Sequence, residues 1–432
     1  MRYPNTIDKN IYLAYIRKEN ASMKLMQKID SVNLNWDLNY PESLVELCIK
    51  SIADNWATHP IFRSIIVCEN RCLLADILDV DTLPMTELCS HVKDNAFWKR
   101  MFKAKWPKLI NNTTHGKAWI EIYIEKFLAE SLENMKPIEY NVEKMKTLIE
   151  LCSPFVNCLK IDHLEASTET NDSTADHVAF DVILENLNEL KSLSITYDCK
   201  TISTQFYLGC TTITDNDITK FTRGLAHTDL QEFEFHSSKL DPPMLKSIAR
   251  SLDKTRSLTT ISMANCRFGD AGLIAFLKVM THNSLPSLKH ICLRNNFISS
   301  DGAIALTSIL RNRKIETMDL KLNPILAEGA FHILSMANVV GFITLNLSAC
   351  SFDGSITEAL VHVIKFNRTI LDLNLSINRL GDQLGREILK VAKFNPVIRT
   401  LDIRNTDIDL KTKSNIDAII LENREKNNKI HQ

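Results

Sequence analysis

The chain has 432 residues, of which 45% are hydrophobic and 24% charged, proportions that are ordinary for a globular protein with a large core. The formal net charge of −1 gives no general attraction to nucleic acid or anionic lipid. No stretch approaches the ~20 consecutive apolar residues of a membrane span. The polar start lacks a signal-peptide core, and the 11 cysteines form no Cys-x-x-Cys pair. We therefore expect reduced thiols in the cytosol.

The first 153 residues are predicted to be helical. Residues 1–40 are predicted to form a helical leader in which Ile7, Ile11 and Tyr15 share one face. That face would contact either a partner helix or the leader's own domain. Residues 41–153 are predicted to form an all-helical N-terminal domain, which begins with Pro41 in the first turn of a helix.

An aromatic stripe lies within this helical domain. Trp98, Phe102 and Trp106 stand four residues apart, after the capping residues Asp94 and Asn95, and basic residues cover the opposite face. Aromatic residues next to basic ones could bind nucleic acid. A stripe at helical spacing is more often part of a core, so we expect these side chains to be buried.

Residues 154–421 are predicted to form a solenoid of leucine-rich repeats. Two divergent units come first, with strands around Leu159 and Leu193. The polar stretch 165–176 between them is expected to be a surface loop. An insertion near 199–214 lengthens the second unit and either contacts a partner or folds back on the core. Residues 422–432 are predicted to be a polar tail.

Seven regular units follow the template Leu-x-x-Leu-x-Leu-x-x-Asn-x-Leu. Their first apolar positions are 27 to 30 residues apart and are Leu230, Leu258, Leu288, Ile315, Phe342, Ile370 and Ile398. The ninth position is always small and polar, and it is occupied by Ser238, Cys266, Asn296, Asn323, Cys350, Asn378 and Thr406. Such a side chain can bond to backbone groups that point inward where the chain leaves its strand.

A helical stretch follows each predicted strand, for example around Leu273 and Phe276. One strand and one helix per unit predict an α/β fold of the ribonuclease-inhibitor type. This is a leucine-rich-repeat horseshoe with a parallel concave sheet and outer helices, preceded here by the all-α N-terminal domain.

The same register predicts a candidate binding surface. Successive side chains of a strand point to opposite faces, so if positions four and six point inward, positions three, five and seven line the concave sheet. That face is polar and mixed in charge, which suits a protein partner such as a coiled coil better than DNA. The alternative is a sheet that is only solvated. The predicted partner-binding residues are Glu232, Glu234, His236, His290, Arg294, Asp319, Lys321, Asn346, Asp372, Asn374, Asp402 and Arg404.

The sequence contains no recognisable catalytic or cofactor motif. It has no P-loop, no HExxH, no GxSxG and no Cys/His cluster at ligand spacing. We therefore predict a non-enzymatic protein with no cofactor and no metal. His290 beside Cys292 is more often a surface detail than a nucleophile. Arg267 could stimulate GTP hydrolysis from the solenoid rim, although arginine is common at such rims.

The combined pattern resembles one known family over about residues 40–425. It is carried by the segments PESLVELCIKSIADNW, LPMTELCSHVKDNAFWKRMFKAKWPK and LKSLSITYD, in this order, together with the repeats. The chain is similar to the dynein regulatory complex subunit 5 family, also called t-complex-associated testis-expressed protein 1. Members are leucine-rich-repeat subunits of the nexin–dynein regulatory complex, which links doublet microtubules and regulates dynein-driven sliding.

The resemblance implies a scaffold in the cytoplasmic cytoskeleton, in the axoneme of a cilium or flagellum, with a role in sperm motility. It implies other dynein regulatory complex subunits, both coiled-coil and leucine-rich-repeat proteins, and axonemal proteins as partners. We expect no nucleic acid, membrane or small-molecule substrate as a partner, and the resemblance carries over no catalytic residue.

A second function remains open. The apolar residues of 73–78, followed by Leu88, Cys89 and Trp98, are spaced loosely like those of an F-box. In this alternative the chain is an F-box-like leucine-rich-repeat substrate receptor of a ubiquitin ligase, and residues 41–107 bind its adaptor.

Overall fold

The computed structural model describes residues 42–56, 58–62, 64–78, 85–112, 116–135, 141–164, 177–197, 213–280, 284–311 and 313–430. The predicted leader (1–40), the polar loop (165–176) and the insertion up to residue 212 lie outside these ranges. The chain divides into two compact units, Met1–Val92 and Lys93–Gln432. The sequence placed the boundary between helical domain and solenoid further on, after residue 153.

The described part of the first unit is helical. It contains α2 (Leu44–Asp54), α3 (Cys68–Ile77) and α4 (Met85–His91). A capping box starts α2, since the Ser43 hydroxyl accepts the Glu46 N–H (3.2 Å) and the Glu46 carboxylate accepts the Ser43 N–H (2.8 Å). Trp56 and Phe62 are both buried and meet edge to face, with ring centroids 6.4 Å apart.

The second unit begins with three helices, α5 (Asn95–Lys105), α6 (Trp119–Glu133) and α7 (Val142–Cys152), with the 3-10 helix η3 (Pro107–Asn112) after the first. Asp94 caps α5, because its Oδ1 accepts the N–H groups of Ala96 (2.6 Å) and Phe97 (3.1 Å). Trp98, Phe102 and Trp106 are buried, which confirms that the aromatic stripe is core.

The solenoid is built on a parallel sheet that has nine strands in the described part of the chain, ordered as in the sequence. The strands are β1 (Cys158–Ile161), β2 (Ser192–Thr196), β3 (Glu232–His236), β4 (Thr260–Ala264), β5 (His290–Cys292), β6 (Thr317–Asp319), β7 (Thr344–Asn346), β8 (Asp372–Asn374) and β9 (Thr400–Asp402). Equivalent residues of successive units pair directly, as Phe233 with Ile261 and Ile261 with Ile291.

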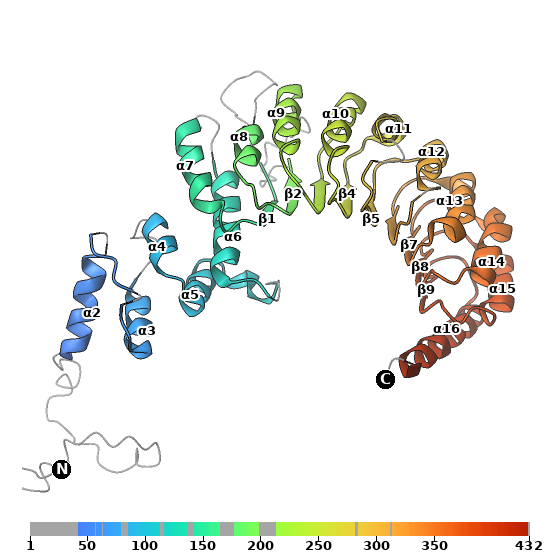
Figure 1. Cartoon of the computed structure of the whole chain (residues 1–432). Helices are drawn as coiled ribbons and strands as arrows, with labels where there is room; N and C mark the ends of the chain where they lie inside the picture. The colour runs from blue at the N-terminus through green and yellow to red at the C-terminus, as the bar shows by residue number, and fades with distance from the viewer. Residues whose placement is uncertain are drawn as a thin grey trace, which may run out of the picture. The chain divides into compact units, whose positions relative to one another are not determined.

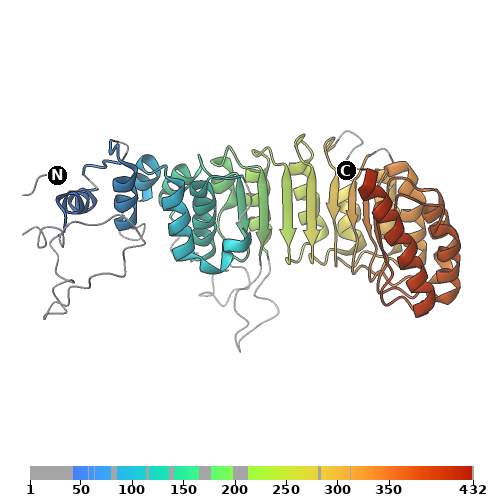
Figure 2. The same cartoon turned by 90° about the horizontal axis from the view of Figure 1, so that it is seen from below.

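A helix follows each strand and covers the core side of the sheet. These helices are α8 (Phe180–Glu185), α9 (Asp215–Leu225), α10 (Pro242–Leu252), α11 (Gly269–Leu277), α12 (Ser300–Leu310), α13 (Leu326–Val340), α14 (Thr357–Phe366), α15 (Gly381–Ala392) and α16 (Leu410–Ile430), with the 3-10 helix η5 (Gly354–Ile356) before α14. Within this unit the helices line the outer side and the strands the inner side (Figure 1), and the strands lie next to one another (Figure 2). The predicted fold class is confirmed. The predicted tail, 422–432, is helical as far as Ile430.

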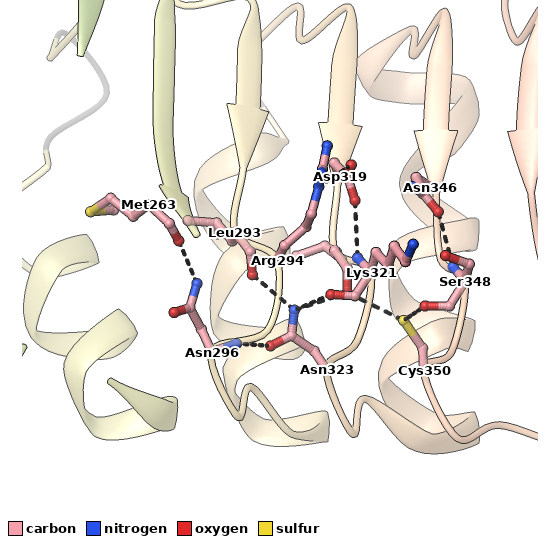
Figure 3. A network of polar contacts seen from close by, with 11 residues as sticks. Met263, Leu293, Arg294, Asn296, Asp319, Lys321, Asn323, Asn346, Ser348 and Cys350 are labelled. Atoms are coloured by element: carbon pink, nitrogen blue, oxygen red, sulfur yellow. Dashed lines mark hydrogen bonds and ion pairs between the residues drawn. The ribbon is translucent and has the colours of Figure 1, made fainter. Parts of the chain in front are cut away.

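The apolar register of the repeats is also confirmed. In all seven units the first, fourth and sixth positions are buried, as are the small polar residues at the ninth. In the fourth regular unit, Asn323 Nδ2 donates to the Leu293 and Leu320 carbonyl oxygens (2.8 Å each), and Asn323 Oδ1 accepts the Asn296 N–H (2.8 Å) (Figure 3). The same oxygen also accepts the Ile298 N–H (3.1 Å). Asn323 therefore ties its unit to the preceding one, whereas the Thr406 hydroxyl donates to the Ile403 carbonyl oxygen of its own unit (2.6 Å).

Cysteine performs the same task where it replaces asparagine. Cys266 Sγ donates to the Phe235 carbonyl oxygen (3.1 Å), and Cys350 Sγ donates to the Leu320 carbonyl oxygen (3.3 Å). Burial raises the pKa of both thiols to about 12. These cysteines are therefore protonated packing groups, and their thiolates are strongly disfavoured.

Helix α6 closes the N-terminal edge of the sheet. Glu125 Oε1 accepts the Cys158 N–H (2.8 Å), and Glu133 Oε1 accepts the Asp162 N–H (2.8 Å). The eight residues from Glu125 to Glu133 rise ~12 Å along the helix, and the four residues of β1 span ~13 Å. The spacing of the two carboxylates therefore matches the length of the strand. This contact explains why α6 belongs to the same compact unit as the strands.

Candidate partner-binding face

The concave face consists of rows of equivalent residues that run across the strands. The third positions pair in register from β3 to β9 and are Glu232, Thr260, His290, Thr317, Thr344, Asp372 and Thr400. The fifth positions form the next row, which is Glu234, Ser262, Cys292, Asp319, Asn346, Asn374 and Asp402. The structure thus brings the predicted residues onto one continuous sheet face.

The fifth-position side chains also have a structural task that the sequence did not reveal. Asp319 and Asp402 accept, through Oδ1, the N–H of the residue two positions later, each at 3.1 Å. Asn346 and Asn374 make the same bond, at 3.1 and 3.0 Å (Figure 3 shows the first). These bonds satisfy the seventh-position N–H groups just beyond the strand ends. The bonds also fix the orientation of these four side chains.

Basic residues occupy the seventh position in three units. Arg294 Nε bonds to Asp319 Oδ2 at 2.8 Å, and the Arg404 guanidinium bonds to both carboxylate oxygens of Asp402, at 2.9 and 2.6 Å. The hydrogen bonds from Arg404 hold the pKa of Asp402 below its ordinary value. Lys321 has no ion-pair partner among the described residues.

Exposure separates these side chains into two groups. Arg294 and Arg404 are exposed, and Lys321 is partly exposed. Asp319 is buried, with only 8% of its surface accessible. Asp319 therefore positions Arg294 and the backbone after β6 more than it offers a surface of its own. Arg294 and Lys321 are therefore the accessible charged side chains in the middle of the face, and Asp319 balances the charge of Arg294.

The N-terminal end of the face is acidic. Glu234 lies 3.2 Å from His236 Nε2, and its hydrogen bond to His236 lowers the pKa of the Glu234 carboxyl group. Glu232 accepts a hydrogen bond from the Ser192 hydroxyl of β2 at 2.8 Å. The polar face thus continues onto β2, and Ser192 could have been added to the predicted site by the same alternation.

The described residues contain no group of three or more His, Cys, Asp or Glu side chains placed to hold a metal ion. Arg267 is exposed in the loop after β4, with φ at 52°. No helix within the described ranges is both long enough and apolar enough to cross a membrane.

Comparison with known proteins supports both the repeat and the resemblance. Residues 254–277 match the Leucine Rich repeat family model. Dynein regulatory complex subunit 5 of Homo sapiens is 24% identical over 272 residues, which cover 58% of this chain and 54% of that protein. The chain is similar to dynein regulatory complex subunit 5. The Chlamydomonas reinhardtii protein of the same name is 24% identical over 200 residues, 46% of this chain and 48% of that protein.

The chain spans about half the length of the curated relatives it matches. Among solved structures, the crystal structure of the Rad7 and Elc1 complex in yeast matches 86% of this chain and 96% of that chain, with 14% identity and a TM-score of 0.45. The resemblance to dynein regulatory complex subunit 5 predicted from the sequence is confirmed by the curated relatives of both organisms.

Proposed function

We propose that the chain is a non-enzymatic scaffold subunit of the nexin–dynein regulatory complex in the axoneme of a cilium or flagellum. Its role would be to help link doublet microtubules and regulate dynein-driven sliding through protein contacts. The similarity to dynein regulatory complex subunit 5 in an alga and a mammal supports this assignment. Leucine-rich-repeat solenoids commonly use such extended concave surfaces for binding.

The observation that carries the binding mode is the electrostatic pattern of the concave face. An acidic end around Glu232 and Glu234 is followed by a basic centre at Arg294 and Lys321. The exposed charges are of both signs and lie on one rigid sheet. A partner with alternating acidic and basic residues, as on the outside of a coiled coil, would complement this face. The partners we propose are other subunits of the complex and axonemal proteins.

The test combines Arg294→Gln with Lys321→Glu. Reversing the charge of Arg294 would place a second carboxylate against buried Asp319, so glutamine, which keeps a donor, is the better choice. Wild-type protein should cofractionate with salt-extracted axonemal complexes, and the double variant should be retained at least ~10-fold less. Lys246→Glu, an exposed lysine of α10, is the matched control and should behave as wild type.

Two outcomes would contradict the proposal. Retention of the double variant at the wild-type level would remove the concave face from the binding mode. Stable binding of the purified chain to an F-box adaptor, without axonemal retention, would instead favour the ubiquitin-ligase substrate receptor.

A further inference from the structure

A second surface of the solenoid carries a motif that the leucine-rich-repeat template does not require. The sequence reads Lys-Phe-Asn at residues 365–367 and again at 393–395, one repeat apart. Phe366 is the last residue of α14, and Phe394 follows the end of α15. Both phenylalanine side chains are 53% exposed. We call residues 365–368 and 393–395 the Lys-Phe-Asn rim.

The asparagines of the rim form a second hydrogen-bonded ladder, at the helix ends. Asn395 Nδ2 donates to the carbonyl oxygens of Ile364 (2.8 Å) and Asn367 (3.0 Å). Asn367 Oδ1 accepts the Ile370 N–H at 2.8 Å, and Asn423 continues the ladder by donating to the Asn395 carbonyl oxygen at 2.6 Å. The backbone that carries each exposed ring is therefore fixed before any partner arrives.

Basic side chains lie close to the rings of Phe366 and Phe394. Lys365 Nζ lies 5.0 Å from the ring centroid of Phe366 and 6.0 Å from that of Phe394, and Lys393 Nζ lies 5.2 Å from the Phe394 centroid. Arg368 donates to the Phe394 carbonyl oxygen at 3.3 Å. None of these three basic side chains has an ion pair with a described residue. The rim thus combines two exposed phenylalanine rings on a fixed backbone with three basic side chains that have no ion pair among the described residues.

We propose that the Lys-Phe-Asn rim binds an amphipathic helix of a partner protein, with apolar residues directed at Phe366 and Phe394 and flanking Asp or Glu residues directed at the basic side chains. Exposed aromatic residues held in a rigid frame are the usual energetic centres of protein interfaces. Carboxylates would neutralise Lys365, Lys393 and Arg368 at the margin of the contact. This surface is separate from the concave face, and the proposal does not depend on the scaffold function.

The geometry fits helical spacing. Because Lys365 Nζ reaches both rings, their centroids are at most ~11 Å apart, and two helical turns rise ~11 Å. Apolar residues four or seven positions apart on a partner helix can therefore cover both rings. Single-stranded nucleic acid, which binds by stacking its bases on aromatic faces, fits less well because lysines already lie over these faces.

A labelled synthetic helix tests the proposal directly. The peptide has ~21 residues, leucine at every seventh position, glutamate beside each leucine and alanine elsewhere. In fluorescence anisotropy it should bind the full-length chain saturably with a Kd at or below ~100 µM. The same peptide with lysine in place of glutamate should bind at least ~10-fold more weakly. Because both peptides are used with the wild-type chain, this comparison does not depend on how any variant folds.

Matched variants locate the site. Phe366→Ala with Phe394→Ala should weaken binding of the acidic peptide at least ~10-fold, as should Lys365→Glu with Lys393→Glu. The controls make the same substitutions at exposed residues elsewhere in this unit, namely Phe297→Ala with Phe331→Ala, and Lys246→Glu with Lys254→Glu. The control variants should retain the wild-type Kd, and circular dichroism should show every variant folded.

Three results would overturn the proposal. The first is no saturable binding of the acidic peptide to the wild-type chain. The second is equal loss of binding in the rim variants and the control variants. The third is tighter binding, through the same rim residues, of a ~20-nucleotide polyuridine or of phosphatidylserine vesicles, which would assign the surface to nucleic acid or to membrane instead.

Discussion

The substitution Asn323→Leu should weaken the solenoid at its centre. Asn323 is fully buried, and its side chain makes hydrogen bonds with Leu293, Asn296 and Ile298 of the preceding unit. Leucine leaves the N–H groups of Asn296 and Ile298 without their acceptor, at a cost of ~1–3 kcal/mol each. Burial of the leucine side chain recovers ~1.5–3 kcal/mol. We therefore expect the free energy of unfolding to fall by ~1–3 kcal/mol.

The assay is urea denaturation at 25 °C followed by circular dichroism, with amide hydrogen exchange as a local measurement. Exchange of the Asn296 and Ile298 amides should accelerate in the variant. Asn323→Cys is the matched control, because cysteine fills the same slot at Cys266 and Cys350, and it should cost only ~1 kcal/mol. If Asn323→Leu leaves the unfolding free energy within ~0.5 kcal/mol of wild type, the account of the slot is wrong.

Three further predictions concern other buried groups. Burial alone would raise the pKa of Asp217, but the hydrogen bonds and the charge interaction with His177 lower this pKa. The contribution of Asp217 to stability is therefore present above about pH 4 and is lost as the pH falls through the lower folded-state pKa. Asp217→Asn should accordingly reduce the fall of the thermal unfolding midpoint at acid pH. Cys266 and Cys350 should resist iodoacetamide in the native chain while the exposed thiols of α2 and α3 react, which peptide mapping would show. Gly224→Ala would place a methyl group 2.6 Å from a backbone oxygen of α8 and should lower the unfolding free energy by ~1–3 kcal/mol in the same denaturation assay.

The repeat register could be predicted from the sequence because each unit requires the same kinds of residue at the same positions. Residues that face the core must be apolar, and the turn after each strand needs a small polar side chain. The backbone of the eighth position gave no such signal. It has positive φ in all seven regular units, including Leu322 (62°) and Ile377 (61°), residue types that rarely adopt this conformation. The turn of the repeat imposes positive φ at this position, even on leucine and isoleucine, which disfavour it.

Contacts between distant segments were harder to predict. Glu125 and Glu133 are eight residues apart on α6, and glutamates in a helix are usually exposed to solvent. The sequence around them therefore does not indicate that they accept the N–H groups of Cys158 and Asp162 at the two ends of β1. On the concave face the alternation of strand side chains placed the residues correctly, but it could not show that Asp319 is buried against Arg294. Their role in binding a partner stays a prediction.

The two glutamates on α6 also bear on strand addition at the β1 edge of the sheet. An uncovered outer strand of a parallel sheet presents unpaired amides to which another chain can add a strand. Repeat proteins whose ends match can in this way grow into open filaments. Because carboxylates already occupy amides at both ends of β1, strand addition at this terminus is blocked, and the solenoid is protected there against end-to-end polymerisation at high local concentration.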